Sequence, residues 1–301
     1  MKNKLTKQGS LSNCKISYIM LAPYLILFTV FTLLPVVISV FLSFTYYNLL
    51  EAPRIIFIDN YRNLFLNDDV FLIAIKNTLL FALITGPVSY LACFLLAWVI
   101  NDFRPKFRAL LTVVFYAPSI SGAVYMIWLI IFSSDSYGFV NSFLMGIGII
   151  RDPVLWLEDP RYVLGVIILV QIWLSLGTSF LAFIAGLQGV DKSLYEAGAV
   201  DGITNRFQEL WFITLPSMRP QLMFGAVIQI TAAFGVGDVS TALAGFPSVD
   251  YAAHTVVNHI TDYGGLRFEM GYASAIATIL FLVMIGTNQM IQKLLKNVGA
   301  A

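Results

Sequence analysis

Six apolar stretches, separated by polar segments, organise the chain. They lie at about residues 18–44, 73–100, 109–132, 162–187, 221–243 and 271–294. Each is long enough for the roughly 20 residues with which a helix crosses the hydrocarbon core of a bilayer. The first is longer than the apolar region of a secretory signal and has no convincing cleavage site, so we expect it to remain as a span. The pattern predicts an all-α, polytopic membrane protein with six transmembrane helices.

Composition supports this class. Hydrophobic residues make up 58% of the 301 positions and charged residues only 12%, about half the charged fraction of a soluble domain. The net charge of +1 gives no reason to expect nucleic acid as a partner. We expect a polar tail over residues 1–17, followed by one transmembrane domain over residues 18–301.

The distribution of lysine and arginine predicts the orientation of the spans. With the N-terminus inside, the inner side collects twelve basic residues: Lys2, Lys4, Lys7, Lys15, Arg104, Lys106, Arg108, Lys192, Arg206, Arg219, Lys293 and Lys296. The outer side collects six: Arg54, Arg62, Lys76, Arg151, Arg161 and Arg267. Inner loops of membrane proteins carry the excess of positive charge. The bias favours both termini inside and outer loops at about 45–72, 133–161 and 244–270.

The polar interval at residues 187–220, between the fourth and fifth spans, is predicted to fold as helix, turn, helix. Either Asp191 or Ser193 can cap a first helix that runs to Val200, and Ser193 with Glu196 has the spacing of a capping box. Gly202 can take a left-handed conformation without steric cost and end that helix.

A second short helix should follow the turn. Thr204 can cap it, and it should run from about Asn205 to Ile213. Both helices carry apolar side chains although they lie in a polar interval, and such exposed apolar surface favours a partner protein. An amphipathic linker without a partner is the alternative.

Three segments of this interval resemble a known motif. Glu196-Ala197-Gly198, Asp201-Gly202 and Ile213-Thr214-Leu215-Pro216 are similar to the EAA loop of permease subunits in binding-protein-dependent ABC importers of the carbohydrate branch, such as maltose and glycerol-phosphate permeases. The resemblance implies a coupling helix that docks on a separate ATPase. The coupling residues it implies are Tyr195, Glu196, Ala197, Gly198, Asp201, Gly202, Phe207, Leu215 and Pro216. The family usually has alanine where this chain has Gly198, and glycine costs about 1 kcal/mol in a helix interior.

Motifs of catalysis are absent from the sequence. It contains no G-x-x-x-x-G-K-[ST] phosphate loop, no H-E-x-x-H and no G-x-S-x-G. Its two histidines, His254 and His259, stand five residues apart in the last outer loop, where a metal site is the less favoured interpretation. We expect a transport subunit without enzyme activity, metal or cofactor of its own, with ATP and Mg²⁺ bound by the partner ATPase.

Polar and aromatic residues inside the spans are candidates for a substrate pathway, because such groups usually face the protein interior or water. The fourth span contains Gln171, Ser175 and Thr178 on one helix face. The fifth contains Gln229, Thr231 and Asp238. Hydrogen bonding between helices would explain such residues equally well.

The third and fourth spans also resemble the maltose permease subunit that touches sugar in the membrane, through their Tyr-x-Pro-Ser and Gln-x-Trp-x-Ser stretches. The substrate-pathway residues implied by this resemblance are Tyr116, Ser119, Gln171, Trp173, Ser175 and Thr178. The fifth span departs from the family, and Gln229 is our substitute there.

The resemblance implies four partners: a second, similar permease, two copies of a cytoplasmic ATPase, an extracytoplasmic solute-binding protein and a sugar. It also implies a place in a bacterial cytoplasmic membrane. One alternative is a secondary transporter driven by an ion gradient, for which Asp238 is the only clear buried-charge candidate. The other is a membrane scaffold that does not transport.

Overall fold

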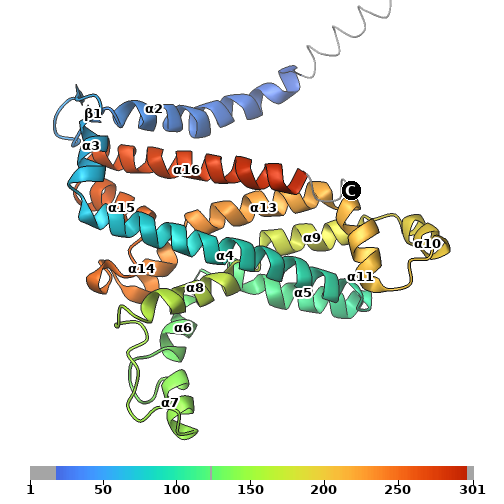
Figure 1. The fold of residues 1–301 in the computed structure, drawn as a ribbon. Helices are drawn as coiled ribbons and strands as arrows, with labels where there is room; N and C mark the ends of the chain where they lie inside the picture. Colours follow the sequence, from blue (N-terminus) through green and yellow to red (C-terminus); the bar gives the residue numbers. More distant parts are fainter. Residues whose placement is uncertain (1–17, 123, 297–301) are drawn as a thin grey trace, which may run out of the picture.

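The computed structural model describes residues 18–122 and 124–296, which form a bundle of long helices. Figure 1 shows α4, α9, α13 and α16 running side by side, with the 187–220 loop at one end of the bundle. The opposite end holds α3, α14, α15 and a pair of very short strands. The tail predicted over residues 1–17 lies outside the described residues.

The helices and strands have the following bounds. In chain order they are η1 (Thr29–Leu33), α2 (Leu34–Leu42), β1 (Thr45–Tyr46), β2 (Arg54–Ile55), α3 (Asp59–Leu66), α4 (Asp69–Asn101), α5 (Pro105–Ile120), α6 (Tyr125–Ile131), α7 (Phe139–Gly146), α8 (Val163–Leu174), α9 (Thr178–Gln188), α10 (Lys192–Val200), α11 (Arg206–Glu209), η2 (Leu210–Thr214), α12 (Leu215–Ser217), α13 (Arg219–Phe234), α14 (Asp238–Ala244), η3 (Val249–Tyr251), α15 (Val256–Thr261), η4 (Asp262–Leu266) and α16 (Met270–Lys296). The described chain is therefore helical apart from the antiparallel pair β1–β2.

In the part of the chain that the structure describes, four helices are long and apolar enough to cross a membrane by themselves. They are Tyr18–Leu42, Asp69–Asn101, Val163–Gln188 and Met270–Leu295. The other two predicted spans are bent pairs: α5 and α6 meet at 89°, and α13 and α14 at 41°. Residues 18–122 and 124–296 thus contain four candidate spans, or up to six if each bent pair is one span.

The bundle is held together by close packing around Phe183 of α9. The Phe183 ring is fully buried. It packs edge to face against the rings of Tyr90 and Phe94 of α4, with 5.4 and 5.7 Å between ring centroids. On its other side lies Gly225 of α13, where an added Cβ would stand 2.4 Å from the ring. Lipid supplies no hydrophobic drive between helices, so packing through small residues is what brings α9 and α13 together.

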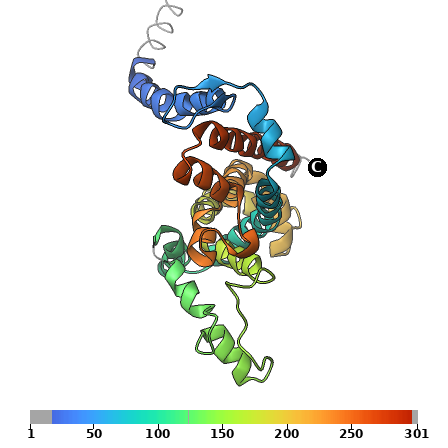
Figure 2. The same ribbon diagram turned by 90° about the vertical axis from the view of Figure 1, so that its left-hand side faces the viewer.

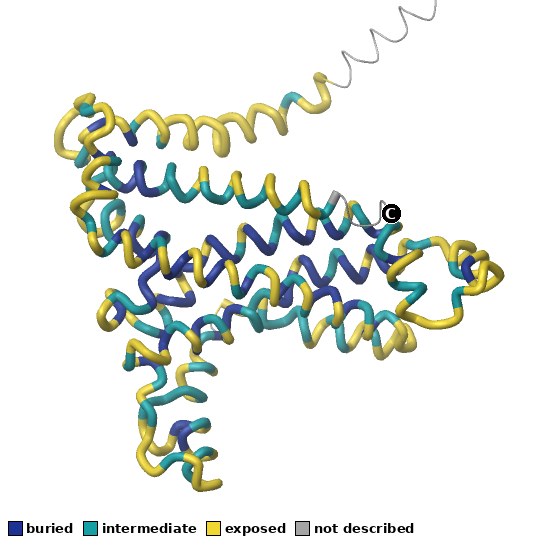
Figure 3. Tube along the Cα trace, in the orientation of Figure 1, coloured by how far each residue is buried: buried dark blue, intermediate teal, exposed yellow. Residues whose placement is uncertain are grey.

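The first helix, by contrast, lies on the outside of the bundle. None of its most apolar window is buried within the chain, and its bundle contacts are to α16. Figure 3 shows it exposed along most of its length. Its end is anchored by Asn60, whose amide donates to the carbonyls of Ser43 and Thr45, both at 2.9 Å.

A side arm formed by α6 and α7 leaves the bundle, as the turned view shows (Figure 2). Its polar centre is the buried amide of Asn141, which donates to the carbonyls of Ser133 and Val154 at 3.1 and 3.0 Å. The Asn141 carbonyl oxygen accepts from the indole N–H of Trp156 at 2.8 Å. These bonds fold the arm back on itself.

The two histidines meet at the end of the bundle opposite the 187–220 loop. His254 Nε2 lies 3.2 Å from His259 Nδ1, and His259 Nε2 lies 3.0 Å from the Asp68 carboxylate. Burial raises the pKa of Asp68, but hydrogen bonds from His259, the Phe71 N–H and Tyr272 outweigh it and lower that pKa to about 2. The Asp68 carboxylate accepts from the Nε2–H of His259. The histidines form a buried polar chain, which their positions in the sequence do not indicate.

Candidate functional sites: the 187–220 loop and the broken-span pocket

The first helix of the 187–220 loop, α10, is capped by Asp191. Its carboxylate accepts from the Ser193 N–H at 3.0 Å, and its backbone is extended. Of the two predicted caps, Asp191 is correct. The predicted capping box of Ser193 with Glu196 is wrong, because Ser193 already lies inside the helix.

The turn follows the prediction, and the second helix follows it with two corrections. Gly202 has φ +92°, the left-handed conformation expected at the end of the first helix. The cap of the second helix is Asn205 rather than Thr204: the Asn205 side chain accepts from the Gln208 N–H at 2.8 Å, and Gln208 Oε1 accepts from the Thr204 N–H at 3.1 Å. Each side chain thereby satisfies a free N–H at the helix start. The helical path also continues beyond Ile213, through η2 and α12 to Ser217.

Two contacts join α10 to η2 and make the loop a folded unit. The Tyr195 hydroxyl lies 2.9 Å from Thr214 Oγ1. Gly198 is buried against Ile213, and an added Cβ there would stand 2.6 Å from Ile213 Cδ1. The glycine that was expected to weaken the first helix therefore allows the second one to approach it closely.

The outer surface of the loop presents the other implied coupling residues. Glu196, Ala197 and Asp201 are exposed, and Leu215 and Pro216 are half-buried. Large apolar side chains are exposed beside them: Val200 at 88%, Phe207 at 72% and Trp211 at 64%. Exposed apolar side chains of this size favour an interaction surface.

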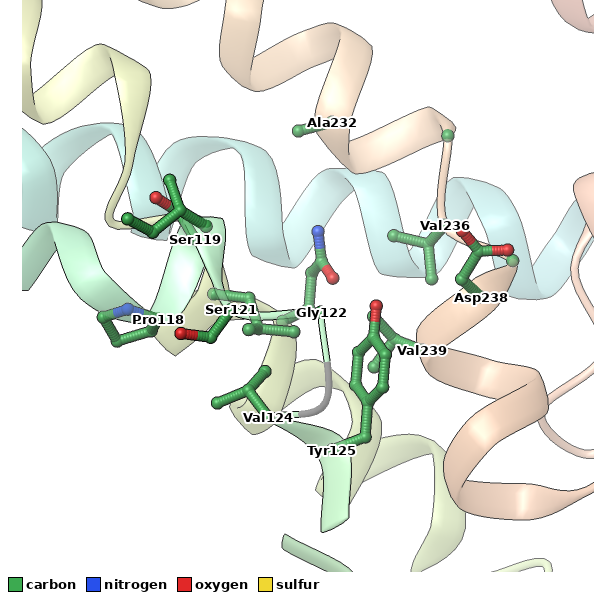
Figure 4. Close-up of a pocket in the computed structure, with 15 residues that line it drawn as sticks. Pro118, Ser119, Ser121, Gly122, Val124, Tyr125, Ala232, Val236, Asp238 and Val239 are labelled. Carbon is green, nitrogen blue, oxygen red and sulfur yellow. The ribbon is translucent and has the colours of Figure 1, made fainter. Parts of the chain in front are cut away.

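A pocket of about 300 Å³ lies where the bent spans break. The end of α5, the start of α6 and the α13–α14 junction line it, together with the last turn of α8 (Figure 4). The α8–α9 interruption adjoins it, since a Cβ on Gly177 would stand 2.7 Å from Ser119. Transporters place substrate sites at such broken helices, because unwound backbone there lines a cavity instead of facing lipid. We call this the broken-span pocket.

Two of the predicted pathway residues, Ser119 and Gln171, line the broken-span pocket. The others do not, and their contacts differ. Trp173 meets Trp128 edge to face at 5.3 Å. Gln229 is buried and donates to the Ser175 carbonyl at 3.1 Å. For Gln229 and Ser175 the structure shows hydrogen bonding between helices.

Two predicted residues lie near the broken-span pocket without lining it. The Tyr116 carbonyl accepts from the Ser119 hydroxyl at 2.7 Å, so Tyr116 holds the orientation of a lining residue. Thr178 is exposed at the first position of α9. The roles of both in transport remain predictions.

Two polar lining residues, Ser121 and Tyr125, were not among the predicted pathway residues, and a third, Asp238, was a candidate in the fifth span that the family resemblance did not include. Figure 4 shows the Tyr125 side chain pointing into the pocket, and Asp238 lies at the opposite wall. Asp238 is the one charged group among the lining residues. The sequence contains a signal for the break between α13 and α14, because Gly235 and Gly237 interrupt an apolar run immediately before Asp238. Carboxylate, phenol, amide and hydroxyl groups all exchange hydrogen bonds with polyhydroxylated ligands.

The comparisons with known proteins decide the family. The chain is 34% identical over 275 residues to the probable ABC transporter permease protein YesP of Bacillus subtilis, covering 89% of this chain and 86% of that protein. The chain belongs to the ABC transporter permeases. No protein-family model matches it.

Two further relatives agree with membership of the ABC permeases. The arabinooligosaccharides transport system permease protein AraP of Bacillus subtilis is 30% identical, covering 89% of this chain and 84% of that protein. A chain of a bacterial alginate ABC transporter, solved in complex with an alginate pentasaccharide-bound periplasmic protein, is 27% identical with a TM-score of 0.74, covering 96% of this chain and 98% of that one. Its membership of this family, together with its long apolar helices, identifies the chain as a membrane transport protein.

Proposed function

We propose that this ABC permease is one transmembrane subunit of an ATP-driven importer for a sugar or oligosaccharide. The single observation that carries the proposal is the broken-span pocket, a polar cavity at the junctions of bent spans in a chain of this family. Relatives named for arabinooligosaccharide transport and for alginate import support a carbohydrate as cargo.

The importer would contain four further components. A second permease completes the pathway, two copies of an ATPase bind ATP and Mg²⁺, and an extracytoplasmic binding protein delivers the sugar. The alginate transporter, solved with its periplasmic protein, supports the last of these. We place the 187–220 loop in the cytoplasm of a bacterium, with both termini inside the cytoplasmic membrane. The exposed Phe207 and Trp211 would enter the ATPase surface.

Movement of the loop would reach the broken-span pocket through the helices on either side of it. The loop continues α9 on one side and α13 on the other, and these two helices pack on each other and on α4. ATP binding closes the ATPase dimer and shifts the loop, and the spans turn the pocket from one membrane face to the other. Gln171, Ser119, Tyr125 and Asp238 would bind hydroxyl groups of the sugar on its way.

The energy source distinguishes this function from the two alternatives. Cells that carry the chain with its neighbouring transport genes would be supplied with radiolabelled arabinotriose and maltotriose, with and without deletion of the chain. We expect uptake that requires the chain, stops on ATP depletion and persists with a protonophore. Uptake that survives ATP depletion would support a secondary transporter, and uptake unaffected by the deletion would support a scaffold.

Substitutions inside and outside the broken-span pocket test whether the pocket lies on the transport pathway. Gln171→Leu removes a hydrogen-bonding amide from the pocket wall and Asp238→Asn removes its negative charge, and we expect each to lower uptake at least tenfold at unchanged membrane levels. Thr278→Val on α16 removes a hydroxyl that bonds within its own helix, outside the pocket, so it is the matched control and should keep uptake within about twofold. Normal uptake in the Gln171 and Asp238 variants would remove the pocket from the pathway.

A further inference from the structure

Arg206 connects the 187–220 loop to a transmembrane helix that is not its neighbour in sequence. Its guanidinium forms an ion pair with the carboxylate of Asp102, the residue directly after α4. The same guanidinium lies over the ring of Trp98, 4.6 Å from its centroid. The adjacent Phe207 ring also meets Trp98, at 5.7 Å between centroids. Two consecutive residues of the loop, Arg206 and Phe207, therefore both contact the end of α4.

The end of α4 is in turn tied to the start of α5. Arg108 of α5 donates to the Asn101 carbonyl at 3.2 Å and lies 3.4 Å from the Asn101 side-chain oxygen. Only three residues, 102 to 104, separate the two helices. A displacement of Asp102 must therefore move the beginning of α5 as well.

The helix α5 leads directly to the broken-span pocket. It starts at Pro105 and ends at Ile120, and its last residues, with Ser119 among them, line the pocket. The contact of Arg206 with Asp102 and Trp98 consequently gives the loop a second mechanical connection to the pocket. This connection is separate from α9 and α13, to which the loop is covalently joined.

We propose that Arg206 is a positioning residue that latches the coupling loop to the α4–α5 turn and transmits loop movement to the pocket through α5. The inference rests on the proposed function of the loop as the site where an ATPase docks. Arginine suits the role because its planar guanidinium can pair with a carboxylate and stack on an indole at the same time. Lysine offers a single point charge and cannot stack in this way.

The exposure of the pair fits a contact that changes during a transport cycle. The side chains of Arg206 and Asp102 are 50% and 46% exposed. An exposed ion pair alone contributes little to the stability of a fold. Substitution should therefore leave the protein folded and in the membrane, while the connection between loop and pocket is lost.

A substrate-free assay tests the latch in the assembled complex. The chain would be purified with its second permease and ATPase in lipid nanodiscs, with Cys14 and Cys93 replaced by serine and Ser121→Cys as a reporter in the broken-span pocket. The rate at which a charged methanethiosulfonate reagent modifies the reporter is measured with and without ATP and vanadate. We expect ATP and vanadate to change this rate at least fivefold in the reporter background.

Charge reversal then distinguishes a latch from an ordinary surface pair. Arg206→Asp and Asp102→Arg should each reduce the nucleotide-dependent change to below twofold, with the ATPase still co-purifying. The double variant restores the opposite charges and should recover at least half of the change. Lys293→Asp makes the same charge reversal at an exposed position of α16, away from the cavity that Arg206 and Asp102 line, and should behave like the reporter background.

The outcomes separate the latch from the function on which it rests. A full nucleotide-dependent change in Arg206→Asp, or no recovery in the double variant, would overturn the latch alone. Failure of any ATPase to co-purify with the reporter background would overturn the proposed function and the latch with it.

Discussion

At the residue scale, the turn of the 187–220 loop depends on one glycine. Gly202 has φ +92°, and no atom lies within 4 Å of the position that a Cβ would take. A side chain there would not collide with a neighbour, so the cost of substitution lies in the backbone conformation. For residues other than glycine that cost is roughly 1–2 kcal/mol. Gly202 thus sets the angle between α10 and α11.

Gly202→Asp should abolish uptake while the protein stays in the membrane. It adds backbone strain at the turn and a second carboxylate beside Asp201, on the surface where the ATPase is proposed to dock. Gly202→Asn introduces the same strain without the charge and should retain part of the uptake. Radiolabelled sugar uptake, compared with membrane levels by immunoblot, measures both. Normal uptake by Gly202→Asp would exclude the turn from coupling.

A second residue of interest, His254, sits in the buried polar chain with His259 and Asp68. Burial, followed by the charge of the neighbouring His259 ring, lowers the pKa of His254 to about 4, against opposing effects of Asp262 and Asp68. An unfolded histidine titrates near 6.5. Between these values the unfolded chain binds more protons than the folded one, so stability is greatest above pH 6.5 and falls as the pH drops towards 4.

We expect the melting temperature of the purified protein in detergent to fall between pH 7 and pH 5. The loss of stability has an upper limit of about 1.4 kcal/mol per pH unit for one such group. His254→Gln keeps an N–H that can donate to His259 but does not titrate, so its melting temperature should depend less on pH. An equal pH dependence in both proteins would show that His254 is not responsible.

At the element scale, helix packing depends on where glycines meet large side chains. Gly225 faces the Phe183 ring and brings α13 against α9. Gly286 of α16 has no atom within 4 Å of a Cβ position. The two glycines have the same conformation and opposite surroundings, which makes them a matched pair.

Gly225→Ala should destabilise the protein by about 1–3 kcal/mol, the usual cost of overpacking a dense core. Gly286→Ala meets open space and should leave stability unchanged or slightly higher, because alanine favours the helix. Thermal unfolding of both variants in the same detergent measures the difference. Equal melting temperatures would mean that Phe183 moves aside without cost.

At the scale of the whole molecule, the two ends of the bundle should face opposite sides of the membrane. The 187–220 loop and the end of α16 lie at one end, and the side arm with α7 lies towards the other (Figure 1). This arrangement agrees with the excess of lysine and arginine predicted for the inner side. Ser193 and Tyr137 are exposed reporters of the two ends.

Single cysteines in a chain without Cys14 and Cys93 test this orientation. An impermeant maleimide should label Tyr137→Cys in intact cells, and it should label Ser193→Cys only after the membrane is permeabilised. The reverse pattern would place the loop outside, where no ATP is available, and would refute the proposed mechanism.

The sequence alone determined the features that depend on local order. Runs of about 20 apolar residues predict helices in a bilayer, and Gly202 predicts the turn of the loop. Both features depend only on residues that are close together in the sequence. The bends inside the third and fifth predicted spans were not predicted, although Gly235 and Gly237 were there to suggest one of them.

The tertiary structure decided which polar residues meet. Gln229, expected in the pathway, bonds to the Ser175 carbonyl, whereas Tyr125 and Asp238, from two different bent spans, line one pocket. Arg206 and Asp102 pair across a long stretch of chain. A periodic pattern tells which face of a helix is polar, but the neighbour of that face depends on how helices cross and where they break, and those are set by packing between distant segments.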